Sequence, residues 1–197
     1  RFDKKHKDIS NILDKILKKT GEDYEKVHGS RDYFRIRKGN VDYEFVPVRK
    51  IIRPKEAENV TDLSYFHVNF VKKNLGGRTK RGILIAKKFF KAQRVYGAES
   101  YVNGFSGYAV ECLIIYYKSF EKMLRELCKV SDRKLIIDMK KLYRKKENVL
   151  IEMNEAKSRA PVILVDPTWK ERNVLAALSE ETFRKFQESA KEFLRKP

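Results

Sequence analysis

The chain has 197 residues, of which 42% are apolar and 12% aromatic, and this excludes a disordered basic tail. Forty-five Lys and Arg against 27 Asp and Glu give a net charge of +18. Such an excess points to a polyanion, namely nucleic acid, a nucleotide or an anionic membrane surface. A ribosomal or chromatin-like binding protein is the plainest interpretation at this point. No apolar stretch approaches about 20 residues and no signal peptide is visible, so we expect a cytoplasmic protein.

The first third of the chain predicts a helix followed by an antiparallel meander, which is a fragment of an α/β lobe. Apolar residues at helical spacing predict a helix over 8–19, which Gly21 ends. Alternating residues predict three strands and one hairpin turn, at 24–28, 33–37 and 41–48, with the turn at 38–40. A polar connector follows at 54–59.

The remainder predicts a mostly helical domain. Helices are expected at about 64–73, 80–95, 108–127 and 181–194, and short strands at 134–138 and 161–165. The charged stretch 140–159 suggests a hairpin with 148–153 as one arm. Cys112 and Cys128 would lie on one helix about 24 Å apart, too far for a disulfide, which indicates a reducing compartment.

The stretch 87–111 carries the strongest functional signal. A basic amphipathic helix runs into a Tyr-Gly corner, and the small-residue loop 103–107 then opens a second helix. Gly and Ser at a helix start leave backbone N–H groups directed outward, which suits an anionic phosphate. Ser106 itself is more simply explained as an N-cap than as a ligand.

Several motifs closely resemble the archaeal-type (class I) CCA-adding enzymes, the tRNA nucleotidyltransferases of the polymerase-beta superfamily. These motifs are Phe89-Phe90-Lys91-Ala92, Val95-Tyr96-Gly97-Ala98-Glu99, Gly104-Phe105-Ser106-Gly107-Tyr108, Val165-Asp166-Pro167 and Arg172-Asn173-Val174. The resemblance implies an α+β fold. Residues 1–55 would form the rear of a nucleotidyltransferase palm, packed on a mostly helical central domain of poly(A)-polymerase/oligoadenylate-synthase type (56–197).

The same resemblance implies the activity and the partners. The chain would be part of a template-independent enzyme that adds CCA to tRNA 3′ ends from CTP and ATP, with magnesium as cofactor. No membrane is involved, and a homo-oligomer stays open. The alternative is a non-catalytic RNA-binding protein on a degenerate nucleotidyltransferase scaffold. A polyadenylating or oligoadenylate-type relative is a weaker option.

Glu44 is the candidate catalytic and metal-binding residue. The alternation of the third strand places Asp42 and Glu44 on one face, with Val41, Tyr43 and Phe45 on the other. By itself this pattern indicates an ordinary two-faced strand with a solvated acidic side. The resemblance implies more, because the family has a carboxylate, typically Asp, at the place of Glu44.

The other two carboxylates of the family are not found. The family has a Gly-Ser motif and an Asp-x-Asp strand immediately before the region that matches residue 1, whereas Gly29-Ser30 follows the first helix. We therefore expect these acids to come from a second chain or from a missing N-terminal segment.

The resemblance also implies the nucleotide-binding residues. Ser64 and His67 match a family Thr and His that face the triphosphate, although each also fits an ordinary structural role. Lys87 and Tyr96 match a lysine and tyrosine that contact nucleotide phosphate. By spacing alone, Lys87 and Lys91 are the solvated face of an amphipathic helix.

Arg172 matches the family arginine that reads the incoming C or A base together with tRNA backbone phosphate. The forked donors of a guanidinium suit both tasks. Lys91 and Arg94 join Arg172 as candidate RNA-binding residues, and Asp166 and Asn173 are expected to hold the loop in place.

Overall fold

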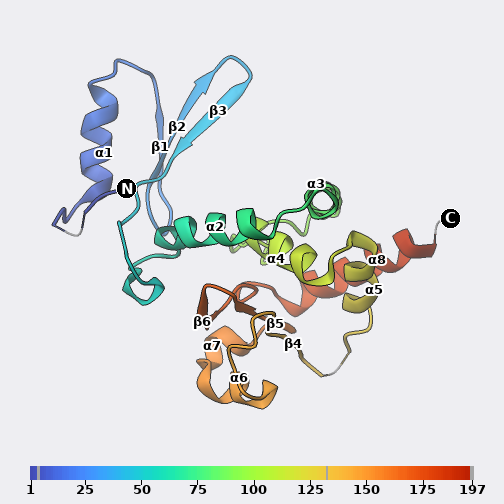
Figure 1. Cartoon of the computed structure of the whole chain (residues 1–197). Helices are drawn as coiled ribbons and strands as arrows, with labels where there is room; N and C mark the ends of the chain where they lie inside the picture. The colour runs from blue at the N-terminus through green and yellow to red at the C-terminus, as the bar shows by residue number, and fades with distance from the viewer. Residues whose placement is uncertain (4, 132, 196–197) are drawn as a thin grey trace. The chain divides into compact units, whose positions relative to one another are not determined.

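The computed structural model describes residues 1–3, 5–131 and 133–195, in an α+β fold as predicted (Figure 1). These residues fall into two compact units, Arg1–His67 and Val68–Pro197. The predicted domain boundary after residue 55 differs from this division and stays a prediction.

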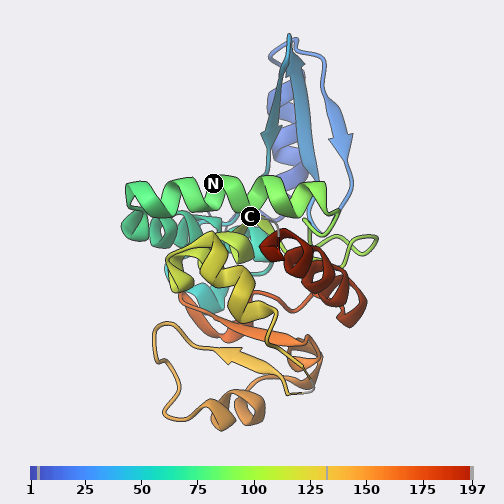
Figure 2. The ribbon, with the colours of Figure 1, turned by 90° about the vertical axis from the view of Figure 1, so that its right-hand side faces the viewer.

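The first unit is a three-stranded antiparallel sheet with a helix on one face. Helix α1 (Ile9–Lys18) precedes β1 (Glu25–Val27), β2 (Tyr33–Lys38) and β3 (Val41–Phe45), in the order β1-β2-β3. Leu13 and Leu17 of α1 pack against Phe34 and Ile36 of β2, which form a small apolar cluster. Figures 1 and 2 show α1 along this face. The predicted helix and meander are confirmed.

After β3 the chain forms two short 3₁₀ turns, η1 (Pro54–Glu56) and η2 (Val60–Leu63), and enters α2 (Ser64–Asn74). Asn59 and Asp62 form a capping box at η2. The Asn59 side chain accepts a hydrogen bond from the backbone of the turn, and the Asp62 side chain accepts one from the backbone N–H of Asn59. Asp62 thus stabilises the turn that leads directly into α2.

The second unit has a large core built mainly from helices, and a smaller apolar cluster formed by Tyr143, Val149, Met153, Ile163 and Val165. It contains α3 (Gly77–Ala92), α4 (Gly107–Tyr117), α5 (Phe120–Leu127) and α8 (Glu180–Arg195). Phe90 of α3, Phe105 before α4 and Phe186 of α8 meet with ring centroids 4.8–5.1 Å apart. All three rings are fully buried, so they fix the relative positions of these helices.

The single helix predicted over 108–127 is wrong, because the structure breaks it in two. Lys118 adopts a left-handed backbone with φ of 66°, and Ser119 caps α5 by accepting from the backbone N–H of Lys122. Cys112 therefore lies in α4, whereas Cys128 ends α5, and both are free thiols. The separation estimated along one helix does not apply.

A second small sheet lies in the same unit, in the order β4-β5-β6 (Leu135–Ile137, Val162–Asp166 and Trp169–Asn173). Strands β4 and β5 are parallel, and a parallel pair needs a crossover connection. The stretch suggested as a hairpin is that crossover and forms α6 (Lys146–Glu152) and α7 (Glu155–Ser158), so the hairpin is wrong. Figure 2 shows these helices, in orange, beside the strands.

The loop between α3 and α4 is held tightly by backbone contacts. Tyr96 and Phe105 form an isolated parallel bridge, and the N–H of Gly104 donates to the carbonyl of Gly97 at 2.8 Å. A Cβ at Gly104 would lie only 2.3 Å from the carbonyl oxygen of Val95. Gly104 is therefore required by close backbone approach.

Among the described residues, no helix is both long and apolar enough to cross a membrane.

Candidate functional site

The acidic face of β3 lies opposite arginines of β2. Cross-strand pairing sets Glu44 opposite Arg35 and Asp42 opposite Arg37. Glu44 Oε1 lies 3.2 Å from an Arg35 guanidinium nitrogen, and Asp42 Oδ1 lies 2.7 Å from Arg37 Nε. The hydrogen bond from Arg37 lowers the pKa of Asp42. The two acids share one face, as predicted, and both are exposed.

The other face of β3 differs from a usual core strand. Val41, Tyr43 and Phe45 lie on the side of the apolar cluster, yet each is 40–50% exposed. The sheet order also leaves β3 paired on one edge only within the part of the chain that the structure describes. An apolar, one-sided edge strand is a template for a further strand.

The first residues of the chain define a register along that free edge. Phe2 forms a parallel bridge with Arg49, because its N–H donates to Val48 at 2.8 Å and its carbonyl accepts from Lys50 at 2.7 Å. Extended backwards in this register, a strand leading into Arg1 would run beside Val46 and Glu44.

The acids present do not form a metal site by themselves. Over the described ranges, no group of three or more His, Cys, Asp or Glu side chains is placed to hold a metal ion. Magnesium and similar divalent ions prefer several oxygen ligands, whereas Glu44, which is paired with Arg35, supplies one carboxylate. The residues that the structure describes therefore do not by themselves fit the magnesium implied by the resemblance.

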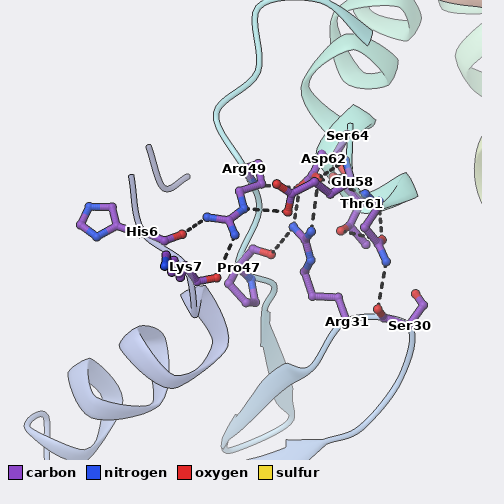
Figure 3. Close-up of polar contacts among 11 residues, drawn as sticks. His6, Lys7, Ser30, Arg31, Pro47, Arg49, Glu58, Thr61, Asp62 and Ser64 are labelled. Carbon is purple, nitrogen blue, oxygen red and sulfur yellow. Dashed lines mark hydrogen bonds and ion pairs between the residues drawn. The ribbon is translucent and has the colours of Figure 1, made fainter. Parts of the chain in front are cut away.

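Figure 3 shows a buried carboxylate that joins the segment after β3 to the start of α2. The Asp62 side chain is inaccessible to solvent and forms a two-pronged ion pair with Arg31. It also accepts backbone N–H groups from Arg49 at 2.7 Å, and from Glu58 and Asn59 at 3.1 Å each. Sequence reasoning missed Arg31, because an Arg beside a Gly-Ser pair carries no local signal of burial.

Ser64 and His67 both lie in the first turn of α2, next to this network. Residues three apart on a helix share one side, so their side chains are neighbours. Ser64 is exposed, and its hydroxyl donates to the carbonyl of Thr61 at 2.6 Å, as expected of a turn residue. Their assignment to a nucleotide stays a prediction.

Lys87, Tyr96 and the N-terminus of α4 converge. A Cβ on Gly107 would lie 2.7 Å from the Tyr96 hydroxyl and 4.0 Å from Lys87 Nζ. Lys87 Nζ also donates to Glu111 Oε1 at 2.6 Å, and both side chains are partly buried. Glu111, which sequence reasoning missed, lies one helical turn after Gly107 and holds the lysine against this turn.

Arg172 is anchored beside the same turn. Its guanidinium lies 2.8 Å from Asp166, a carboxylate that is fully buried. Asp166 also accepts hydrogen bonds from Tyr108 at 3.2 Å and from both the backbone and the hydroxyl of Thr168. Tyr108 follows Gly107 directly, so its hydrogen bond to Asp166 links the loop that holds Arg172 to the first turn of α4.

The loop residues behave as the sequence indicated. Asn173 holds the loop by accepting from the backbone of Leu164 and Leu175 at 3.0 and 2.9 Å. Ser106 caps α4 by accepting from the N–H of Ala109 at 3.1 Å. Burial and the neighbouring Cys112 and Asp166 raise the pKa of Tyr108, so its phenol stays protonated.

The candidate RNA-binding residues Lys91 and Arg94 are exposed at the end of α3. Lys91 Nζ lies 5.2 Å from the centre of the Tyr96 ring, which is a cation–π contact. Arg94 has a left-handed backbone, with φ of 56°, which turns the chain into the loop.

Residues 81–197, which hold this whole cluster, match the sequence family described as the second domain of tRNA nucleotidyltransferases. The chain belongs to this family. A relative named CCA-adding enzyme from Nanoarchaeum equitans is 43% identical over 185 residues, which are 93% of this chain and 47% of that protein. CCA-adding enzymes of Methanosarcina mazei and Saccharolobus solfataricus are 34% and 33% identical, over 91% and 95% of this chain and 37% and 42% of theirs. The resemblance to archaeal-type CCA-adding enzymes is confirmed, and the chain spans less than half the length of these relatives.

Solved structures of RNA-extending enzymes share the fold. The Cid1 poly(U) polymerase has a TM-score of 0.67 at 12% identity, covering 95% of this chain and 72% of its own. A cytoplasmic RNA terminal U-transferase has a TM-score of 0.64 at 10% identity, covering 99% and 75%. At this identity the likeness concerns the fold alone.

Proposed function

We propose that this chain is part of a template-independent tRNA nucleotidyltransferase that adds CCA to tRNA 3′ ends from CTP and ATP. The observation that carries the proposal is the convergence of Lys87, Tyr96 and Gly107 at one helix start. Arg172, anchored by the buried carboxylate of Asp166, is linked to the same helix start through Tyr108. The relatives named CCA-adding enzyme support the same activity.

The reaction is attack of the tRNA 3′-hydroxyl on the α-phosphate of the nucleotide. The new bond joins that oxygen to phosphorus, and the bond to the β-phosphate breaks to release pyrophosphate. Lys87 neutralises phosphate charge, and because an ammonium has three donors it can keep Glu111 as a partner. The Tyr96 hydroxyl and the positive end of α4 contribute further donors to the same phosphates. Positioning and charge neutralisation thus supply most of the catalysis.

Arg172 reads the base. Asp166 takes one side of the guanidinium, which leaves other N–H groups of the fork to bond a base edge and a tRNA phosphate. Lys91 and Arg94 extend this contact to the RNA backbone. Ser64 and His67 act as further triphosphate ligands from the start of α2.

Glu44 needs carboxylates from outside residues 1–197. A strand that carries the family's Asp-x-Asp pair would add to the free edge of β3 in the register that Phe2 already makes with Arg49. Its acids would then lie beside Glu44 and complete the ligands for magnesium. The strand belongs either to another segment of the same polypeptide or to a partner chain. We further propose a cytoplasmic location.

The second candidate is a non-catalytic RNA-binding protein. One observation favours it, namely that Glu44 is ion-paired with Arg35 on an exposed strand, as a solvated surface acid would be. A pure RNA-binding protein needs the basic residues but neither Glu44 nor nucleotide affinity. Nucleotide binding therefore discriminates between the two candidates.

Lys87→Ala is expected to weaken binding of both CTP and ATP about tenfold or more, because it removes a charge-assisted contact to phosphate. Isothermal titration calorimetry with each nucleotide measures the change, and binding by the parent chain should weaken as salt rises. Lys88→Ala is the matched control, since this neighbour on α3 is exposed and outside the cluster. Equal affinity in the Lys87 variant and the parent would remove that lysine from the site.

Arg172→Ala is expected to impair the choice of C and A over U and G more than the overall rate of addition. The base loses its fork of donors, while the triphosphate contacts of Lys87 and Tyr96 remain. Incorporation of each of the four nucleotides into a tRNA that lacks its 3′ end, measured in the complete enzyme, reports the ratio. If incorporation of all four nucleotides slows by the same factor, Arg172 does not read the base.

A further inference from the structure

We propose a second RNA contact, a basic cavity in the second unit that holds a phosphate of the tRNA backbone. The cavity has a volume of about 370 Å³ and lies where β4 and β5 begin, against α8. The inference rests on the proposed function, because it takes the tRNA as its ligand. Its cationic lining is formed by Lys134, Arg159 and Arg184.

The charge of the cavity is positive. Among the described lining residues three cations face one carboxylate, that of Glu180, which lies 3.3 Å from Arg184 Nε with both side chains more than half exposed. Arg159 lies 3.8 Å from Glu155, and these side chains are 76% and 88% exposed. Exposed pairs of this kind contribute little net stability, so both arginines can turn to a stronger anion. A phosphate offers a guanidinium the two-pronged geometry that it prefers.

Lys134 is held in place for the same task. Its Nζ donates to the carbonyl oxygen of Ser158 at 2.5 Å, which uses one of three donors and fixes the amine at the start of the strands. Pro161 and the buried Phe183 form an apolar part of the lining. Low-dielectric walls strengthen the field of the surrounding cations.

The cavity is separate from the cluster at α4. Lys134 precedes β4 and Pro161 precedes β5, whereas Asp166 ends β5 and holds Arg172. Five strand residues at about 3.3 Å each put roughly 15 Å between the two ends. A single nucleotide bound at Arg172 does not extend to the cavity, but a longer RNA can contact both sites.

Backbone phosphate is the chemistry that the cavity suits best. Its described lining carries three cations against one carboxylate and two neutral polar side chains, and phosphate contacts position RNA without reading sequence. The net charge of +18 indicates the same partner for the chain as a whole.

The test compares two triple variants of the whole chain with a tRNA transcript that lacks its 3′ CCA. Lys134→Gln/Arg159→Gln/Arg184→Gln removes the three positive charges of the lining and leaves Glu180 in place. The control, Lys122→Gln/Arg133→Gln/Lys185→Gln, removes equal charge from exposed residues of the same unit, two of them direct neighbours of cavity residues. Fluorescence anisotropy over roughly 50–200 mM salt gives the affinity and its salt slope.

We expect the cavity variant to bind the tRNA at least about tenfold more weakly, with a salt slope shallower by about 2, while CTP binding is unchanged. The control should lose much less. Equal losses in the two variants, no loss in the cavity variant, or loss of CTP binding would each overturn the cavity as a backbone site. A parent chain that binds no tRNA would overturn the proposed function as well.

A footprint on the parent chain keeps the inference testable if the triple variant does not fold. The tRNA should slow acetylation of Lys134 much more than that of Lys185, as read by mass spectrometry. Equal protection of the two lysines would contradict the inference.

Discussion

Arg31→Ala is expected to lower the free energy of unfolding of the first unit by about 3–5 kcal/mol, because it leaves a buried charge without its partner. The Asp62 side chain is inaccessible and that of Arg31 is 10% exposed, so water cannot replace the guanidinium. Three backbone N–H groups also depend on this carboxylate. Because Asp62 stabilises the turn that leads into α2, the loss should also disorder Ser64 and His67. Urea unfolding followed by circular dichroism measures the change.

Arg37→Ala is the matched control. It removes another Arg–Asp pair from the same sheet, but Arg37 is 72% exposed and Asp42 44% exposed. Exposed pairs contribute between 0 and about 1 kcal/mol, so this variant should unfold nearly as the parent does. A similar loss in the free energy of unfolding in the two variants would show that burial does not make the Arg31–Asp62 pair more stabilising than an exposed pair.

Glu44→Gln in the complete enzyme is expected to reduce CMP and AMP addition by more than about 100-fold, with folding and tRNA binding nearly intact. Loss of an outer-shell partner at a metal site already costs about 10–100-fold, and a direct ligand should cost more. Glu44 is exposed on an edge strand, so the amide replacement leaves the core untouched. The assay is incorporation of labelled nucleotide into a tRNA that lacks its 3′ end.

Asp42→Asn separates the catalytic role from a general effect of the acidic face. Asp42 lies two residues before Glu44, on the same face and in a similar cross-strand pair. The enzyme should stay active with this change. If both variants lose activity equally, the charge of the face matters and Glu44 has no specific part.

The fold could be predicted from the sequence where a local pattern of residues was enough to identify a helix or a strand. Period-two alternation and the Lys38-Gly39-Asn40 turn located β2 and β3, and helical spacing located α1, α3 and α8. The helix break at Lys118 was not predicted, because no Gly or Pro marks it. Ser119, which caps α5, is the residue that could have indicated it. Strand β6 was not predicted either, because the sequence Trp169-Lys170-Glu171-Arg172-Asn173 is mostly charged. It forms a strand through its pairing with β5.

The site divides in the same way. Lys87, Tyr96 and Arg172 were indicated by motif resemblance; the structure brings Lys87 and Tyr96 to the start of α4 and links Arg172 to it through Asp166 and Tyr108. Residues that support them were not visible, because their role depends on contacts far along the chain. Glu111 pairs with Lys87 at 24 residues' separation, and Arg31 pairs with Asp62 at 31. Spacing along a sequence reports local structure, and such pairs exist only once the core has formed.

One measurement tests the central claim most directly, namely nucleotide addition by residues 1–197 with and without the acidic strand. Labelled CMP and AMP incorporation into a tRNA lacking its 3′ end is measured for the chain alone, and then with a polypeptide that carries the family's Gly-Ser and Asp-x-Asp strand. The account predicts no addition by the chain alone, because Glu44 by itself cannot hold the ions beside a triphosphate, and addition when both are present. Robust addition by residues 1–197 alone, or none after the strand is supplied, would contradict it.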